Sequence, residues 1–478
     1  MKFMKCLCAF LLVTASPLFA QQPSLESAER VQNLSAPKLV GYFPQWGVYN
    51  GTFGNGGYFV KNVITSGSAS RLTHLNYAFA NVVNNQCASF DTYADYQFAF
   101  TADETVNGKA DSQAPGAFVG NFHQLQELKE RYPQLHIVMS IGGGSAAPNA
   151  FSAAALPANR AAFVKSCVDM YIHGNFAPGL HKPGIFDGFD IDWEYPASNA
   201  DMTNLTALLK EFRKQLDQIS PGMTLSLAVN ANSWAYQYIN LNAVQHPLSS
   251  IDVMGFDFDG PWNNTTGFVA PLYQSLLDPC PTCNDNAGVE AFLGLGVAPD
   301  KIVLGVPFYG YEWTDVPNTN NGLFEPGTPV GSGSEYNYIV TIENQFTKYR
   351  DPNAMVPWLY DGNNFWTYED PVSLTVKMDY VRRHHLAGAM IWEISGDMPH
   401  GILVKTLDKG LQRRPGDEVC RSSTNPGRRT TSANKPSVGR NMIAKFVVVG
   451  GSIYFSFTVF AAARMTASSF VPASLIAG

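Results

Sequence analysis

The chain has 478 residues, of which 45% are hydrophobic and 15% are charged. This composition supplies enough apolar surface for a large folded core and excludes an intrinsically disordered protein. The formal net charge of −7 argues against a nucleic-acid-binding protein, because phosphate backbones are bound by basic surfaces.

The N-terminus has the pattern of a secretory signal peptide. Lys2 and Lys5 precede an apolar stretch, and Ala20 supplies a small residue before the expected cleavage point. The apolar stretch is too short to span a bilayer comfortably. We therefore predict a signal peptide over residues 1–20, a polar lead over 21–37, and a secreted protein, extracellular or periplasmic.

Removal of the signal peptide leaves an odd number of cysteines: Cys87, Cys167, Cys280, Cys283 and Cys420. Cys280 and Cys283 have C-x-x-C spacing, but no second pair lies nearby to complete a zinc site. They form either a small loop disulfide or two thiols without a function. The sequence predicts no metal and no cofactor.

Eight short β-rich apolar runs recur along the chain, separated by helix-like segments such as 122–131, 204–219 and 374–384. The eight runs are Leu39–Phe43, His74–Ala80, His136–Ile141, Phe186–Asp192, Thr224–Val229, Ile251–Phe256, Ile302–Pro307 and Ala387–Trp392. A doubly wound open sheet would alternate in a similar way, but eight strands favour a (β/α)₈ TIM barrel of the α/β class.

The segment between the seventh and eighth predicted strands is too long for a simple crossover. It contains a Gly- and Pro-rich run at 322–333 and an aromatic run at 358–368. We expect an inserted α+β subdomain over about 311–375, within a catalytic barrel that covers 38–413.

Residues 414–478 form a tail that is first basic and then apolar, and no acidic residue follows Glu418. The uncharged stretch 446–463 is near the lower limit of length for a membrane span. A secreted barrel would place the basic cluster outside, opposite to the usual charge bias. A membrane anchor is therefore less favoured than a disordered tail or an aberrant one, such as translation past the natural end of the reading frame.

The fourth predicted strand carries acidic residues at alternate positions. Residues two apart in a strand share a face, so Asp190, Asp192 and Glu194 point into the barrel while the apolar residues between them face the helices. Carboxylates in a confined space raise one another's pKa, which keeps one of them protonated as a general acid requires. A solvated strand end or a metal site is less favoured, because carboxylates from one strand make a poor metal cage.

The spacing Asp187-x-x-Asp190-x-Asp192-x-Glu194 resembles the signature of glycoside hydrolase family 18, the chitinases and their relatives. Four more segments resemble motifs of that family on the third, sixth, seventh and eighth strands: Ser140-Ile-Gly142-Gly143, Met254-Gly-Phe256-Asp257, 305–310 and 388–393. The resemblance covers roughly residues 38–413 and does not extend to the tail.

The resemblance implies a chitinase that acts on chitin or N-acetylglucosamine oligosaccharides by a retaining, substrate-assisted mechanism. Glu194 would protonate the glycosidic oxygen and the substrate's own acetamide would attack the anomeric carbon. Asp192 would bind the acetamide N–H, Asp190 would share a proton with Asp192, and Ser140 would help to hold Asp190. The protein is expected to be a monomer.

The resemblance also implies the residues that surround the catalytic group. The expected substrate-binding residues are Trp392, Asp257, Phe256, Met254, Tyr42, Trp262, Tyr309 and Tyr195. The expected supporting residues are Ser140, Gly142, Gly143 and Asp187. Two positions depart from the family pattern, because Phe256 stands where tyrosine is usual and Tyr311 stands where many members have arginine. These changes predict a modest loss of turnover rather than an inactive site.

Two other functions are compatible with a barrel of this kind. An endo-β-N-acetylglucosaminidase of glycoprotein glycans or peptidoglycan would use the same acids, but such enzymes commonly lack the insertion. A non-catalytic chitin-binding lectin would typically have lost the acid at position 194, and here Glu194 is present.

Overall fold

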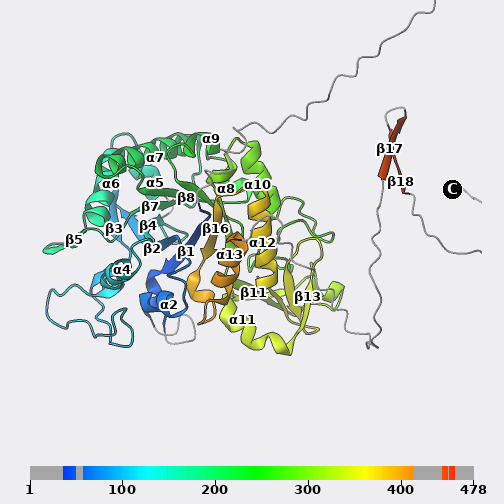
Figure 1. Ribbon diagram of the computed structural model, residues 1–478, viewed down its shortest axis with the longest axis horizontal. Coiled ribbons are helices and arrows are strands. Elements are labelled where there is room, and N and C mark those ends of the chain that lie inside the picture. The colour runs from blue at the N-terminus through cyan, green and yellow to red at the C-terminus, as the bar shows by residue number, and fades with distance from the viewer. Residues whose placement is uncertain (1–35, 50–56, 148, 413–443, 450–451, 458–478) are drawn as a thin grey trace, which may run out of the picture. The chain divides into compact units, whose positions relative to one another are not determined.

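The computed structural model describes residues 36–49, 57–147 and 149–412, together with two strands at 444–449 and 452–457. The chain divides into two units, 1–415 and 416–478. In the first unit, eight parallel strands pair in the order β1-β16-β10-β9-β8-β7-β4-β2, and β1 also pairs with β2. Because β1 pairs with both β16 and β2, the ring of strands is closed, which confirms the TIM barrel. Figure 1 shows these strands with helices around them.

All eight predicted strands are present within a few residues of their expected bounds. The barrel strands are β1 (Lys38–Pro44), β2 (His74–Val83), β4 (His136–Gly142), β7 (Gly188–Asp192), β8 (Thr224–Asn230), β9 (Ser250–Met254), β10 (Ile302–Pro307) and β16 (Gly388–Trp392). A short strand, β3 (Gln86–Ser89), continues from β2 as an antiparallel hairpin.

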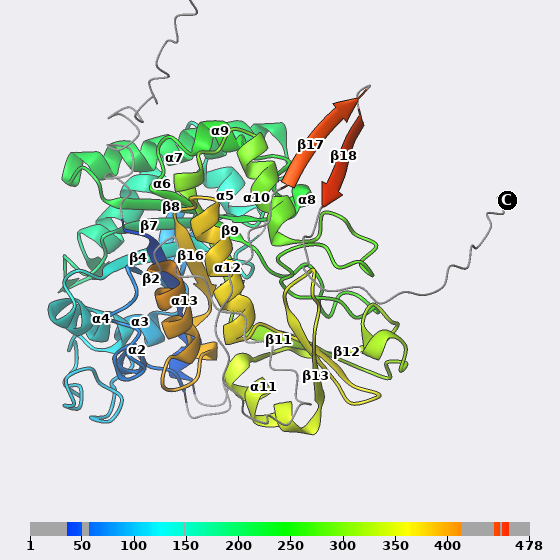
Figure 2. The same ribbon diagram turned by 45° about the vertical axis from the view of Figure 1, so that its right-hand side comes forward.

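Helices surround the barrel, as Figures 1 and 2 show. The longer ones are α4 (Gly120–Arg131), α6 (Arg160–Cys167), α7 (Asn199–Ile219), α10 (Asp285–Gly294), α12 (Pro371–Arg383) and α13 (Ile402–Gln412). The shorter ones are α2 (Val60–Thr65), α3 (Thr92–Tyr96), α5 (Ala150–Ala154), α8 (Ser233–Tyr236) and α9 (Leu241–Val244). The three helical segments predicted from the sequence fall in α4, α7 and α12.

Strand parity divides the core into two layers. On β7, the apolar residues Phe189 and Ile191 are fully buried in the layer between the strands and the helices. A second apolar cluster fills the barrel interior, where Val40, Met254 and Met390 come from three different strands. The alternation predicted for the fourth strand is therefore the alternation between these two layers.

The expected α+β insertion lies between β10 and β16, as predicted. It consists of β11 (Tyr309–Thr314), β12 (Thr328–Glu335), α11 (Tyr336–Ile342), β13 (Thr347–Arg350), β14 (Pro357–Tyr360) and β15 (Phe365–Thr367). Its strands form an antiparallel sheet in the order β12-β11-β15-β14-β13. The sheet begins slightly earlier than residue 311, and the end of the predicted range overlaps α12, which covers the barrel.

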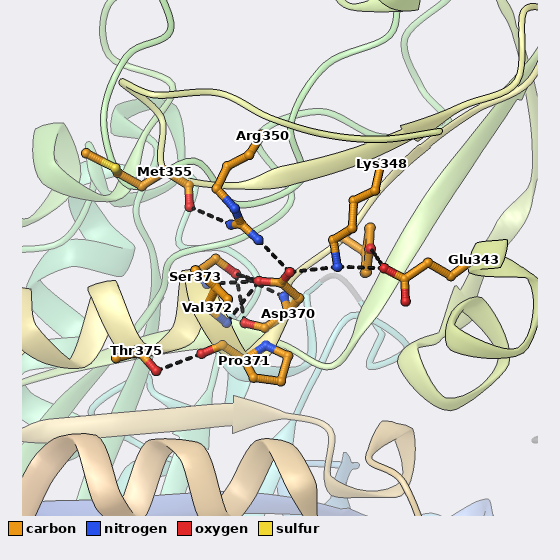
Figure 3. Close-up of polar contacts among 10 residues, drawn as sticks. Glu343, Lys348, Arg350, Met355, Asp370, Pro371, Val372, Ser373 and Thr375 are labelled. Carbon is orange, nitrogen blue, oxygen red and sulfur yellow. Dashed lines mark hydrogen bonds and ion pairs between the residues drawn. The ribbon is translucent and has the colours of Figure 1, made fainter. Parts of the chain in front are cut away.

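Asp370 joins the insertion to the barrel helix that follows it, as Figure 3 shows. Its Oδ1 accepts hydrogen bonds from the backbone N–H groups of Val372 and Ser373 and so caps α12. Its Oδ2 forms ion pairs with Lys348 Nζ at 2.8 Å and with Arg350 Nη2 at 2.5 Å, and both of these side chains come from β13. One carboxylate therefore serves a helix cap and two ion pairs that link neighbouring parts of the fold.

We expect Asp370→Ala to lower the free energy of unfolding by about 3 kcal/mol, because it removes a helix cap and two ion pairs. Arg350 loses its acidic partner, whereas Lys348 keeps its ion pair with Glu343. Asp370→Asn keeps the acceptor that caps the helix, so its loss of unfolding free energy should be about half that of Asp370→Ala.

The pH dependence of this stabilisation follows from the pKa of Asp370. Burial alone would raise this pKa, but Arg350 and Lys348 hold it below its ordinary value of 3.8. The stabilisation by this carboxylate is therefore present above pH 3.8 and lost as the pH falls further. Urea denaturation at neutral and acidic pH checks this, and equal losses for both variants would contradict it.

Two disulfides are present in the first unit. Cys87 on β3 is bonded to Cys167 on α6 across 80 positions of sequence. Cys280 is bonded to Cys283, which is the loop disulfide that the C-x-x-C spacing left as one alternative. Cys420 lies outside the described residues.

The second unit contains one antiparallel pair, β17 (Ala444–Val449) and β18 (Ser452–Phe457). The apolar stretch 446–463 is thus strand where it is described, and residues 450–451 and 458–463 lie outside the described part. Of the helices that the structure describes, none is long and apolar enough to cross a membrane. The predicted signal peptide also lies outside the described residues.

Candidate active site

A pocket of about 640 Å³ opens at the carboxyl-terminal ends of the barrel strands, where TIM-barrel enzymes hold their active sites. Residues from the ends of β1, β2, β4, β7, β8, β9 and β16 contribute to it. Its lining consists of Gln45, Trp46, Phe79, Phe90, Asp91, Gly144, Ser145, Asp192, Glu194, Tyr195, Asn230, Met254, Phe256, Asp257 and Trp392.

Asp190 lies beneath the pocket and is fully buried. Tyr42 Oη and Ser140 Oγ each donate a hydrogen bond to its Oδ2 at 2.7 Å. Ser226 Oγ donates to its Oδ1, also at 2.7 Å. Burial raises the pKa of Asp190, and these three donors oppose the rise because they stabilise the anion.

Asp192 is the next residue of β7 that points into the barrel, and unlike Asp190 it has an oxygen without a hydrogen-bond donor. It lines the pocket, is 4% exposed, and its Oδ1 receives no hydrogen bond. Burial raises its pKa well above the ordinary range, and the charges of Glu194 and Asp190 raise it further. Because Asp190 has three donors to its oxygens, a proton held by this pair is best placed on Asp192.

Glu194 lies two residues beyond the end of β7 and is half-buried at the pocket wall. Burial raises the pKa of its carboxyl group, a hydrogen bond from Tyr195 lowers it, and the charge of Asp257 raises it again. A carboxyl group with a raised pKa that reaches an open pocket is suited to act as a general acid.

Strand parity also places acidic and polar groups that the sequence analysis did not single out. Asp252, on β9 two residues before Met254, is buried inside the barrel. Burial raises its pKa to about 7, with a further contribution from Asp190 and an opposing one from Lys38. The same alternation on β8 carries Ser226 inward. Both residues could have been found from the period of two in their strands.

Three aromatic rings lie together at one side of the pocket. Trp392, at the end of β16, lies nearly parallel to Phe79, with ring centroids 5.6 Å apart. Trp46 is 6.3 Å from both rings. Of the three, Trp392 was predicted to bind substrate, whereas Phe79 was not identified from the sequence. Stacked aromatic rings of this kind offer an apolar surface to the face of a sugar ring.

Asp257 is held by two tyrosines from the start of the insertion. Tyr309 Oη donates to its Oδ1 at 2.5 Å and Tyr311 Oη donates to the same oxygen at 2.8 Å. Burial raises the pKa of Asp257, and these two donors oppose the rise. Met254 and Phe256 line the adjacent wall, so both point inward as their spacing predicts.

Gly142 and Gly143 are required by the backbone at the end of β4. Both have positive φ, at 117° and 79°. A Cβ atom at Gly142 would collide with the backbone oxygen of Asp192, and one at Gly143 would collide with the ring of Phe79. These glycines therefore allow the carboxylate strand and the aromatic group to approach β4.

Four of the residues singled out from the sequence do not line the pocket. Tyr42 and Tyr309 do not line the pocket, because their hydroxyls are directed to Asp190 and Asp257. Asp187 precedes β7, at the end of the strand opposite to the pocket, and pairs with Lys129. Trp262 is 56% exposed and contacts Tyr311 rather than the pocket.

Within the described residues, no group of three His, Cys, Asp or Glu side chains is arranged to hold a metal ion.

The model of the family Glycosyl hydrolases family 18 matches residues 38–397. The chain belongs to this family. Similar proteins include Chitinase 63 of Streptomyces plicatus, which is 34% identical over 409 residues, covering 81% of this chain and 62% of the relative. Chitinase C of Streptomyces lividans is 35% identical, covering 76% of this chain and 58% of the relative. The chain thus spans about three fifths of the length of these two curated relatives.

A solved structure agrees with this family 18 assignment. The catalytic domain of psychrophilic chitinase B from Arthrobacter TAD20 is 33% identical, with a TM-score of 0.72. The similarity covers 79% of this chain and 95% of that domain.

Proposed function

We propose that this protein is a chitinase that hydrolyses β-1,4-linked N-acetylglucosamine polymers and oligomers with retention at the anomeric carbon. The observation that carries the proposal is the placement of Asp192 and Glu194 on one pocket wall, with Asp190 held beneath them by three hydroxyl donors. The names of the relatives add support for chitin as the substrate.

In this mechanism Glu194 donates a proton to the glycosidic oxygen as the bond to the anomeric carbon breaks. The oxygen of the substrate's acetamide group attacks that carbon and forms an oxazolinium ion. Asp192 shares its proton with Asp190, and as that proton passes to Asp190 the Asp192 carboxylate accepts a hydrogen bond from the acetamide N–H and stabilises the developing positive charge. The ionised Glu194 then takes a proton from a water molecule as that water attacks the anomeric carbon and opens the oxazolinium ring. This proton transfer restores the acid form of Glu194.

The test is product analysis on chitin oligosaccharides with the purified protein. NMR of the first products should show the β-anomer, because two displacements at one carbon retain its configuration. Cello-oligosaccharides of equal length are the control, since they lack the acetamide and should not be cut. Equal cleavage of the two substrates would exclude substrate assistance.

Phe256 tests how the acetamide pocket is built. Phe256→Tyr would place a hydroxyl beside the pocket that Asp192 also lines. If that hydroxyl reaches the acetamide, kcat/KM on N-acetylglucosamine oligomers should rise about fivefold, which corresponds to about 1 kcal/mol. A clear fall in kcat/KM with unchanged folding would show instead that the site is adapted to phenylalanine, because an unpaired buried hydroxyl is costly.

The proposal includes secretion. The N-terminal pattern of two lysines, an apolar stretch and Ala20 supports a signal peptide that is cleaved after residue 20. The two disulfides of the barrel unit support an oxidising compartment, because such bonds are rare in the cytosol. N-terminal sequencing of protein recovered from the medium or periplasm tests it, and the mature chain should begin at Gln21.

A further inference from the structure

Two acidic side chains outside the catalytic pocket, Glu335 and Glu393, lie where the insertion joins the barrel, and Glu335 packs against the turn that follows Glu393. Glu335 is the last residue of β12, and Glu393 directly follows Trp392 at the end of β16. Glu393 is 5% exposed, and the Oε2 atom of each residue is buried and receives no hydrogen bond. In the part of the chain that the structure describes, neither carboxyl group forms an ion pair. Two adjacent buried carboxylates would repel each other and lose their hydration.

The surrounding backbone leaves these groups little freedom to separate. Phe308 donates a backbone hydrogen bond to the oxygen of Trp392 at 2.8 Å, and Tyr336 donates one to the oxygen of Phe308 at 2.8 Å. A Cβ atom at Gly396 would collide with both Glu335 Oε2 and the oxygen of Phe308. The carboxyl group of Glu335 is thus packed against the turn that follows Glu393.

Further contacts tie the first helix of the insertion to the same turn. Asn337 Nδ2, on α11, donates to the backbone oxygens of Ser395 at 3.0 Å and Asp397 at 3.3 Å. The position of the turn after Trp392 therefore depends on how the insertion sits against it.

The groups that face the pair are acidic or neutral. Burial raises the pKa of Tyr58, and the charges of Asp397 and Glu393 raise it further. Burial also raises the pKa of Tyr336, and the charges of Asp370, Asp397 and Glu343 raise it further. The Asp397 carboxylate is occupied by the backbone N–H groups of residues 398, 403 and 404. Among the described residues, no cation contributes to the pKa of Glu335 or Glu393.

We infer that Glu335 and Glu393 share a proton, and that this shared proton holds the insertion against the end of β16 and keeps Trp392 in place in the pocket. They are positioning residues, because they act on the substrate through Trp392 and do not touch it. The part of this inference that concerns substrate binding rests on the proposed chitinase function.

The direction of the pH dependence follows from burial. Burial raises the pKa of Glu335 to about 8, from an ordinary value of 4.5. Burial, and then the charge of Glu335, raises the pKa of Glu393 as well. The folded protein therefore keeps a proton that the unfolded chain releases near pH 4.5. The stabilisation by the pair is fully present below pH 4.5 and is lost as the pH rises through about 8.

The first experiment measures the Tm of the full chain as a function of pH for the wild type and Glu335→Gln. Glutamine keeps the shape and hydrogen-bonding groups but cannot ionise, so the Tm of the variant relative to wild type should rise by about 2 °C per pH unit between about pH 5 and 8. Glu130→Gln, at an exposed position on α4, is the matched control and should parallel the wild type. Parallel curves for Glu335→Gln and wild type would overturn the shared proton.

One further measurement tests whether a bound cation, rather than a shared proton, neutralises Glu335 and Glu393, and another tests whether the pair positions Trp392. Added Ca²⁺ should not change the wild-type Tm, and a rise that Glu335→Gln lacks would show a cation in place of the proton. On N-acetylglucosamine oligomers, the ratio of wild-type to variant KM should rise about threefold between about pH 6 and 9, with a constant kcat ratio. A constant KM ratio would overturn the role in positioning Trp392. A protein inactive on chitin would refute the proposed function but leave the Tm test intact.

Discussion

Glu194→Gln is expected to lower kcat on chitin oligosaccharides by about 10³-fold while leaving their binding nearly unchanged. Glutamine has the same shape but cannot give a proton to the leaving oxygen. The acid matters here because Asp190 is fully buried beneath the pocket and Asp257 is held by two tyrosines. Asp192 also lines the pocket, but in the proposed mechanism it binds the acetamide group. Initial rates and calorimetric titration with a non-cleaved oligomer measure the two effects separately.

The control for this variant is Glu130→Gln, which makes the same chemical change at an exposed site on α4. Its kcat should equal that of the wild type. If Glu194→Gln retained as much as a tenth of the wild-type rate, the proton donor would have to be another residue of the pocket.

Asp192→Asn is expected to lower kcat by about 10²-fold, because the amide cannot balance the positive charge that develops on the oxazolinium ring. The change leaves Asp190 with its three hydroxyl donors. KM should change less than kcat, since the lost interaction is strongest in the transition state. Steady-state kinetics on a chitin oligomer check this expectation.

Asp187→Asn is the matched control, because Asp187 belongs to the same sequence motif but pairs with Lys129 at the opposite end of β7. This variant should lose stability to urea while the folded enzyme keeps its kcat. A loss of kcat as large as that of Asp192→Asn would show that the motif acts as one unit rather than as two separate sites.

Much of the site could be predicted from the sequence because a β-strand has a fixed period of two. The alternation on β7 was sufficient to place Asp190, Asp192 and Glu194 on the barrel side, and the same rule carried Met254 and Phe256 into the pocket. Eight apolar runs separated by helical segments were likewise sufficient for the barrel, since each run is long enough for one strand and each gap holds one crossover. These features are local, so they can be read from neighbouring residues.

Only the tertiary structure decided which groups share the space between strands. The three donors to Asp190 come from β1, β4 and β8, and closure of the barrel brings them together. The same closure directs the hydroxyl of Tyr42 beneath the pocket. The disulfide between Cys87 and Cys167 depends on contact between elements far apart in the chain. Strand period determines the face that a side chain occupies, whereas its partner across that face depends on the packing of the whole barrel.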